Sequence, residues 1–346
     1  MSPIVATMPA ESTAGTDRRR LVAPVAVVVV THQSVAWIDR CLDSIRRQDL
    51  ASAEVVVIDA GSRDGSAARA RAHDGVRVVA LAENSGFAVA VNRGVSITRA
   101  PLVAVLNADV ELESGWVAAM VEAARRNPRA ASFGSVQRLA ADPRRLDGAG
   151  DSLHCSGLAW RRGHRCLDSG PERDLEAFSA CAAACLIRRS AFLKAGGFPP
   201  EFHCYFEDVD LGLRLRLAGW NCLLVSKATC LHAGGASADG PRSDFATRLG
   251  HRNMVWSFVR CTPLPLAILL LLPFLAAQAA CLVVGALRGQ GRVVLGAKLE
   301  AIAGLPRILR ERARIQEQRA VSAASYARAL DWSLFPRRRA VPGRRR

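Results

Sequence analysis

The stretch VAVVVVTHQSVAWIDRCLDSI (25–45) decides the fold, because it joins an apolar run to a helical pattern through a short polar turn. Residues 25–30 are almost all valine, and such a β-branched run is typical of a strand buried on both faces of a parallel sheet. Residues 37–45 then place a tryptophan, a cysteine, a leucine and an isoleucine on one face of a helix. The stretch therefore predicts a buried strand followed by a helix.

The same alternation recurs three more times along the chain. Short apolar runs predict strands at residues 55–59, 76–81 and 102–107, and helical patterns follow after Gly65-Ser66, over 87–98 and over 116–126. Four strand–helix units at this spacing predict an α/β fold with a doubly wound, mostly parallel sheet and right-handed crossovers.

The charge of the chain is unevenly distributed. Of the net charge of +16 over 346 residues, residues 1–287 carry +5 and residues 288–346 carry +11. A basic tail on a nearly balanced body does not indicate a DNA-binding body, so no nucleic-acid partner is expected. Half of the residues are apolar and no Gly-X-Y period or repeat occurs, which excludes the disordered, fibrous and solenoid classes.

The cysteines and the N-terminus indicate the setting of the chain. Ten cysteines are scattered from Cys41 to Cys281 without a CxxC pair, which predicts buried thiols rather than a disulfide framework. Residues 1–20 lack the apolar core of a secretory signal and are expected to form a flexible tail. A reducing compartment is the expected setting.

Polar residues follow each of the four expected strands. They are Thr31 to Ser34, Asp59 with the turn 61–65, Asn84 to Gly86, and Asn107 to Asp109. Because ligands of such sheets bind outside the carboxyl ends of the strands, these residues predict a nucleotide-binding crevice. Neither GxGxxG nor GxxxxGK[ST] is present, which disfavours a dinucleotide site and a P-loop. Phosphate is then expected to be held by Asp109 together with a metal ion.

Five phrases of the chain carry a family resemblance, in unbroken order over residues 25–260. Besides the opening stretch they are VVVIDAGSRDGS (55–66), ENSGFAVAVNRGV (83–95), VAVLNADVEL (103–112) and GGFPPEFHCYFEDVDLGLRLRLAGW (196–220). The chain thereby resembles the family 2 glycosyltransferases, and within them the bacterial rhamnosyltransferase-like branch. This resemblance implies a GT-A fold, a nucleotide-diphospho-sugar donor (dTDP-, UDP- or GDP-linked), Mg²⁺ or Mn²⁺, and inversion at the anomeric carbon.

The resemblance also assigns residues to the donor. Asp59 stands where the family contacts the nucleotide base, and Asn84, Gly86 and Asn92 match a phrase that lines the donor site. Asp64 lies in the turn after Asp59, where capping of the next helix is an equally simple role. The expected donor-binding residues are Thr31, Asp59, Asp64, Asn84, Gly86, Asn92 and Asn107.

Asn107-Ala108-Asp109 occupies the position of the family's metal-binding DxD motif, with asparagine in place of its first aspartate. One carboxylate and the two donor phosphates supply the oxygen ligands that Mg²⁺ and Mn²⁺ accept. In some family members a histidine placed like His232 completes the metal shell, so Asp109 and His232 are the expected metal ligands. Capping by Asp109 and a purely structural His232 are the alternatives.

Glu207, Asp208 and Asp210 form the strongest local signal, an acidic segment that leads into a helix ending near Gly219. Acids in a first turn complement the helix dipole, which accounts for one or two of them. An inverting transfer needs a carboxylate that takes the proton of the attacking hydroxyl. In the family this base is the second residue of the ED pair, which is Asp208 here. Glu207 and Asp210 are expected to orient the acceptor or to support the loop.

Residues 264–287 contain no charged side chain and are long enough to cross a bilayer. Basic residues flank them on both sides, so interfacial or membrane-embedded helices are preferred to a span or to packing on the body. An apolar stripe follows from Leu295 to Leu309, interrupted by Pro306 and accompanied by arginines, as in an interfacial helix.

The expected organisation is a tail (1–20), a GT-A domain (21–260) and a membrane-associating helical region (261–346). We expect an inverting glycosyltransferase that moves a sugar such as rhamnose onto a glycan or lipid-linked acceptor in cell-envelope polysaccharide synthesis. It would work at the cytoplasmic face of the inner (plasma) membrane, peripheral or partly embedded, on an anionic membrane surface. The alternative is a catalytically degenerate GT-A protein that binds nucleotide or serves as a scaffold.

Overall fold

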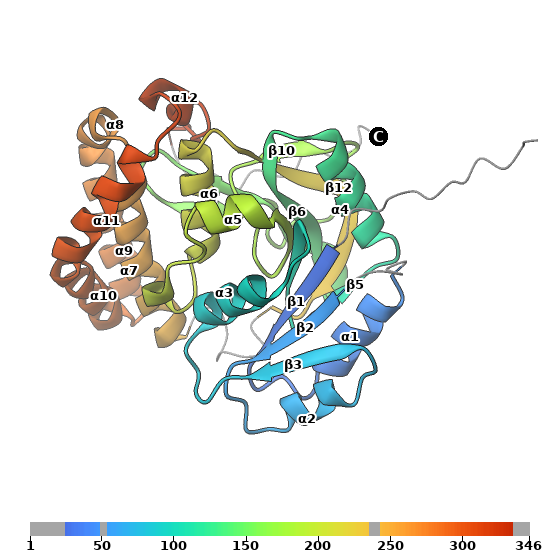
Figure 1. Cartoon of the computed structure of the whole chain (residues 1–346). Coiled ribbons are helices and arrows are strands. Elements are labelled where there is room, and N and C mark those ends of the chain that lie inside the picture. The colour runs from blue at the N-terminus through green and yellow to red at the C-terminus, as the bar shows by residue number, and fades with distance from the viewer. Residues whose placement is uncertain (1–24, 49–53, 235–242, 335–346) are drawn as a thin grey trace, which may run out of the picture.

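The computed structural model describes residues 25–48, 54–234 and 243–334, so the expected N-terminal tail lies outside the described residues. A ten-stranded sheet runs through the centre of the body, with helices on both faces, and a group of C-terminal helices lies beside it (Figure 1). The strands follow one another across the sheet in the order β10-β12-β6-β11-β4-β1-β2-β3.

The first half of the sheet confirms the four predicted strand–helix units. The parallel strands are β1 (Val25–Thr31), β2 (Glu54–Asp59), β3 (Val76–Ala80) and β4 (Leu102–Asn107). The helices between and after them are α1 (Ile38–Arg46), α2 (Ser66–Arg71), α3 (Phe87–Ile97) and α4 (Trp116–Arg126). Every residue of β1 is buried, as its run of valines predicts.

The second half of the sheet mixes strand directions. β11 (Ala184–Arg188) runs antiparallel to β4 and to β6 (Ala130–Leu139), and β12 (Asn221–His232) runs parallel to β6. β5 (Val110–Leu112) adds to β12 and β7 (Asp142–Ala149) adds to β6, while β8 (Asp151–Leu153) and β9 (Ala159–Arg161) form a separate two-stranded sheet. β10 (Leu175–Ala177) pairs with β12 at the edge.

Two apolar cores hold the layers together, one on each face of the sheet. α1 and α4 contribute Ile38, Leu42, Trp116 and Met120 to the first core, whereas α3 and the short helix α5 (Arg189–Lys194) contribute to the second. All ten cysteines are free and six of them are buried, which confirms the prediction of buried thiols.

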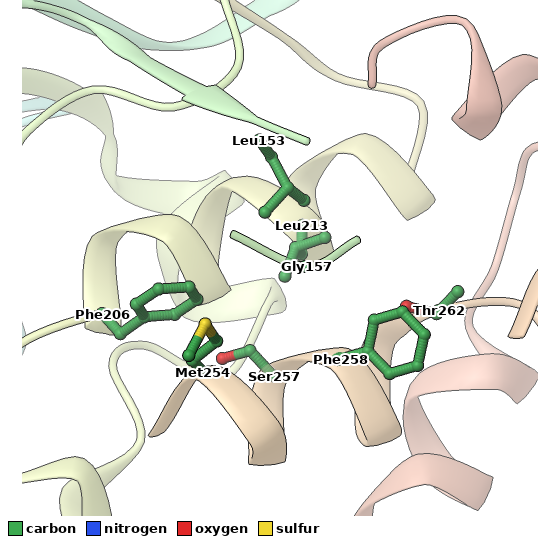
Figure 2. A pocket seen from close by; sticks show the side chains of 8 residues that line it. All are labelled: Leu153, Gly157, Phe206, Leu213, Met254, Ser257, Phe258 and Thr262. Carbon is green, nitrogen blue, oxygen red and sulfur yellow. The ribbon is translucent and has the colours of Figure 1, made fainter. Parts of the chain in front are cut away.

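A third core joins the body to the C-terminal helices. It packs α6 (Glu207–Leu217) against α7 (Asp244–Cys261) and includes Phe274 and Tyr326 from farther along the chain. Figure 2 shows the contact, with Phe206 and Leu213 on the side of α6 facing Met254 and Ser257 of α7. The expected domain boundary after residue 260 therefore falls in the last turn of α7, beside this shared core.

The C-terminal region is a group of helices separated by short breaks. They are α8 (Leu264–Leu269), α9 (Leu271–Leu287), α10 (Gly291–Ala303), α11 (Leu305–Glu317) and α12 (Ala323–Ala327). The stripe predicted from Leu295 to Leu309 is broken at Gly304, just before Pro306, as proline in the first turn of α11 requires. Among the described residues, no helix combines the length and apolar composition needed to cross a bilayer.

Candidate active site

Three of the expected donor-binding residues meet at one edge of the sheet. Thr31, Asp59 and Asn107 end the neighbouring strands β1, β2 and β4, so the parallel register places them side by side. Each has one buried side-chain oxygen without a hydrogen-bond partner among the described residues: Thr31 Oγ1, Asp59 Oδ1 and Asn107 Oδ1. Buried polar atoms are nearly always paired, so three orphan oxygens at one strand edge indicate a polar ligand there.

Asp64 is occupied by protein groups. Its Oδ2 accepts a hydrogen bond from the Val35 backbone N–H at 2.9 Å, and its Oδ1 accepts bonds from Ser66 N at 3.0 Å and Ser66 Oγ at 2.6 Å. Burial would raise the pKa of Asp64, but these bonds outweigh it and lower the pKa. Asp64 thus bonds the first N–H of α2, whose N-cap residue is Gly65.

Gly86 and Asn92 hold a neighbouring loop. Gly86 has φ of 93°, and a Cβ there would lie 2.6 Å from the His203 ring, so the close approach that requires glycine is made by His203. Asn92 donates to the Phe198 carbonyl at 2.7 Å and accepts from Phe198 N at 2.8 Å. The side-chain amide of Asn92, which was expected to line the donor site, therefore bonds the backbone of the segment after α5. Asn84 Oδ1 accepts a hydrogen bond from Gly86 N at 3.1 Å.

Asp109 and His232 come together although they are far apart in the sequence. Asp109 follows β4 and His232 is the last residue of β12, and His232 Nε2 lies 3.3 Å from Asp109 Oδ1. On the other side, His232 Nδ1 lies 2.8 Å from Oδ2 of Asp147, a residue of β7. The imidazole is thus held between two carboxylates in the interior.

The pKa values of His232 and Asp147 are strongly shifted. Burial would lower the pKa of His232, but Asp109 and Asp147 outweigh it and raise the pKa to about 9. Burial would likewise raise the pKa of Asp147, yet Arg161 and His232 bring it down to about 2. With its pKa raised, His232 carries a proton on Nε2 that faces Asp109 Oδ1, and a divalent metal that displaced this proton would meet an imidazole nitrogen and a carboxylate oxygen, ligand types that such ions accept.

The three acids of residues 207–210 differ in access. Glu207 is 6% exposed and Asp210 is 0% exposed, whereas Asp208 is only partly buried. Asp208 accepts hydrogen bonds from Val209 N at 2.8 Å and Ala182 N at 3.3 Å, and burial raises its pKa. Asp208 is therefore the most exposed of the three residues.

Asp210 supports the interior instead. It lies 2.7 Å from Arg214 and 2.9 Å from Arg260, and it accepts a hydrogen bond from Ser257 Oγ at 3.2 Å. Burial would raise its pKa, but the two guanidinium groups outweigh burial and lower it. These contacts tie α6 to α7 through Asp210. Glu207 has a buried Oε2 without a partner and a pKa raised well above its ordinary value by burial and by Asp208.

The segment that leads into α6 has a strained backbone. His203, Tyr205 and Phe206 have φ of 62°, 66° and 72°, values that residues other than glycine rarely adopt. The Nδ2 group of Asn253, buried on α7, lies 2.8 to 3.1 Å from the carbonyl oxygens of residues 202, 204 and 205. Such strain gathers at functional sites where the surroundings enforce it, and here Asn253 enforces it.

Sequence reasoning missed three charged residues of the connection between β6 and β11. Arg161 forms a short ion pair with Asp147. Its charge partly offsets the rise that burial gives to the pKa of Asp208. Asp151 accepts from Ser179 Oγ at 2.8 Å, and burial, with the charge of Asp208, raises its pKa to about 7. Arg161 therefore contacts Asp147, the partner of His232, and its charge also acts on Asp208. The sequence signal that could have pointed to this region is the Arg and His content of residues 135–180.

Comparisons with known proteins show the family and the fold of the chain. The profile of Glycosyl transferase family 2 matches residues 26–195. N-acetylglucosaminyl-diphospho-decaprenol L-rhamnosyltransferase of Mycobacterium tuberculosis is 32% identical over 237 residues, which cover 60% of this chain and 75% of that protein.

Two solved structures share the fold. GalNAc-T7 with UDP, GalNAc and Mn²⁺ has a TM-score of 0.57 at 16% identity over 70% of this chain, which spans 48% of that chain. The mannosyltransferase PcManGT of Pyrobaculum calidifontis with GDP-Man and Mn²⁺ has a TM-score of 0.51 at 18% identity, covering 88% of this chain and 85% of that one. The expected GT-A fold is confirmed.

Proposed function

Because the chain belongs to glycosyltransferase family 2, we propose that it transfers a sugar, with inversion, from a nucleotide-diphospho-sugar to a hydroxyl of a lipid-linked glycan. Rhamnose is the proposed sugar and a polyprenyl-diphospho-sugar the proposed acceptor, since the rhamnosyltransferase relative is named for an acceptor of that class. The reaction would serve cell-envelope polysaccharide synthesis at the cytoplasmic face of the plasma membrane.

The donor is proposed to bind across the carboxyl ends of β1, β2 and β4. The orphan oxygens of Thr31, Asp59 and Asn107 would accept hydrogen bonds from the base and ribose, which supply N–H and O–H donors. Asp64, Gly86 and Asn92 would act indirectly by shaping the loops around the donor, because their polar groups or space are taken by the protein.

The residues fit a divalent metal beside the donor diphosphate. Asp109 would supply a carboxylate oxygen and His232 the lone pair of Nε2, while Asp147 would orient the ring by accepting from its other nitrogen. Two protein ligands leave positions for phosphate oxygens and water, as Mg²⁺ and Mn²⁺ sites commonly do. When bound, such an ion neutralises charge on the departing nucleoside diphosphate.

Asp208 is the proposed general base. Its carboxylate would accept the proton of the acceptor hydroxyl as that oxygen attacks the anomeric carbon and the bond to the diphosphate oxygen breaks. A pKa raised by burial strengthens a carboxylate as a base, and the charge of Arg161 partly offsets that rise.

One observation carries the proposal. Ala182 N donates to Asp208 Oδ2 at 3.3 Å, and the carbonyl of the next residue, Ala183, accepts from Asn107 N at 2.9 Å, which supports one site that joins the donor edge to the proposed base. Intact Asp109 and Asp208 favour sugar transfer over the scaffold alternative.

A donor screen tests the function. Purified full-length protein with Mn²⁺ or Mg²⁺ and a polyprenyl-diphospho-N-acetylglucosamine acceptor is incubated with dTDP-, UDP- and GDP-sugars. Nucleoside diphosphate release and the mass of the lipid product are followed. We expect one donor class to give a product heavier by one sugar residue. Binding of nucleotide without product from any donor would favour the scaffold alternative instead.

A further inference from the structure

The C-terminal helices expose an unusual amount of apolar surface. Of the eighteen large apolar side chains that are exposed among the described residues, thirteen lie between residues 264 and 309. Leu272 is 78% exposed and Leu287 is 82% exposed. We call the exposed apolar side chains of residues 264–309 the apolar face. Contiguous apolar surface of this kind is rare on soluble monomers and marks an interaction site.

The apolar face is the outer side of helices whose inner side is already packed. Leu266, Leu270 and Phe274 are buried, and the ring of Phe274 stacks on that of Phe258 with centroids 3.9 Å apart. The stripe of α10 turns outward, with Leu299 58% exposed. The helices α8 to α11 lie together on the side of the molecule away from β3 and α2 (Figure 1). Their outer side is therefore free to meet a partner.

Cationic residues border the apolar face. Arg288 and Arg292 flank the turn between α9 and α10, and Arg310 and Arg314 lie on α11. All four are exposed, and none has an acidic partner within the ranges that the structure describes. Residues 264–287, which span α8 and α9, carry no charge at all, and the last twelve residues of the sequence add six arginines and no acid. An uncharged centre with a cationic border complements an anionic lipid surface.

The composition favours lipid over protein. The large exposed side chains of the apolar face are all leucine, isoleucine or valine, whereas protein interfaces are enriched in aromatic residues. Among the described residues, no helix is long and apolar enough to cross a bilayer. We propose that the apolar face docks in the interfacial layer of an anionic phospholipid bilayer, with Arg288, Arg292, Arg310 and Arg314 at the headgroups.

Docking would also place the proposed active site. α10 is bound to α7 through Trp256 Nε1, which donates to the Ala301 carbonyl at 3.0 Å, and through Lys298 Nζ, which donates to the His251 carbonyl at 3.2 Å. α7 in turn holds the strained segment before Asp208 through Asn253. A docked face therefore fixes the acidic segment relative to the bilayer, and only this consequence rests on the proposed transfer to a lipid-linked acceptor.

Vesicle flotation tests the docking without donor, acceptor or metal. Full-length protein is mixed with vesicles of phosphatidylcholine alone or with a quarter phosphatidylglycerol. We expect flotation with the anionic vesicles that weakens as salt rises. The double variant Leu272→Asp/Leu287→Asp should bind at least tenfold more weakly. The matched variant Leu167→Asp/Leu193→Asp, at exposed leucines outside the apolar face, should bind like wild type.

A charge series separates the border from the centre. Arg288→Gln and Arg292→Gln should each weaken binding about fivefold, as expected for one basic residue near an anionic leaflet. Arg71→Gln and Arg99→Gln, exposed arginines of the body, should have no effect. The inference is overturned if wild type does not float with anionic vesicles, or if the Leu272→Asp/Leu287→Asp variant floats equally well.

Two further readouts keep the outcomes distinct. Sedimentation without vesicles would overturn the lipid assignment if wild type is a dimer that Leu272→Asp/Leu287→Asp makes monomeric, because a second copy would then cover the apolar face. Nucleoside diphosphate release from donor and water alone should be equal in both leucine double variants, since none of these leucines belongs to the proposed site. A failed transfer assay leaves the flotation result unaffected.

Discussion

Replacing Asp210 by asparagine separates structural support from chemistry within the acidic segment. The Asp210 carboxylate lies 2.7 Å from Arg214 and 2.9 Å from Arg260 in the interior, and it accepts a bond from Ser257. The variant leaves both guanidinium groups without this counter-charge. Because the folded-state pKa of Asp210 is lowered, its stabilising contribution is present at neutral pH and is lost as pH falls through that pKa.

The magnitude follows from the partners that remain. Removing one member of a buried ion pair costs about 3–5 kcal/mol. Arg260 retains Glu311, and Arg214 retains its bond to the Ala195 carbonyl, so we expect a loss near the lower end, about 3 kcal/mol. Urea unfolding at pH 7, followed by far-UV circular dichroism, measures it.

Asp208→Asn is the matched control two residues away. Asp208 forms no ion pair that the structure records, and burial raises its pKa, so the folded state disfavours its charge at neutral pH. Its amide variant should therefore unfold at the same or a higher urea concentration. The reasoning is refuted if Asp210→Asn loses less than about 1 kcal/mol, or if Asp208→Asn loses as much as Asp210→Asn.

Three other changes have defined outcomes. Asp151→Asn removes a negative charge that acts on Asp208. The acidic limb of the pH profile of kcat/KM, which rises as Asp208 loses its proton, should therefore move to lower pH. If a profile from about pH 5 to 9 shows the limb at the same pH, the two carboxylates do not interact. Asn253→Leu removes the side chain that donates to the Cys204 and Tyr205 carbonyls. Turnover should fall at least tenfold, while the nucleotide affinity measured by calorimetry stays unchanged. An equal loss of nucleotide binding would contradict this prediction. Burial lowers the pKa of Lys298 to about 8, so above that pH the unfolded chain binds a proton that the folded protein lacks and stability rises with pH. Lys298→Met should remove this pH-dependent gain in the free energy of unfolding, which is at most about 1.4 kcal/mol per pH unit. The prediction is wrong if, in urea unfolding, the variant and wild type gain equally between about pH 8 and 10.

The strand–helix half of the fold could be predicted because its signals are local. The buried run that became β1 and the helix that became α4 follow from periodicity alone. The insertion of β11 antiparallel to β4 could not, because it depends on a pairing between segments far apart in the chain. Strand pairing over long separations leaves no mark in a short window of sequence.

The candidate site shows the same division. Asp109, His232 and Asp208 were reached through motifs, and the structure brings the first two to 3.3 Å. Asp147 escaped, because it stands 85 residues before its partner His232 in a stretch without a motif. The hydrogen bonds of Asp64 and Asn92 could not be predicted either. Only the folded backbone shows that Val35 bonds the Asp64 carboxylate and that Phe198 bonds the Asn92 amide.

The rate of sugar transfer by Asp208→Asn tests the central claim most directly. With the donor found by the screen and the lipid-linked acceptor, formation of the glycosylated lipid is compared between this variant and wild type at saturating donor. A general base contributes about 10²–10⁴ in rate, so we expect product formation to fall by at least a hundredfold while the nucleotide still binds. Turnover above about a tenth of the wild-type rate would contradict the assignment of Asp208 as the base of a single joined site.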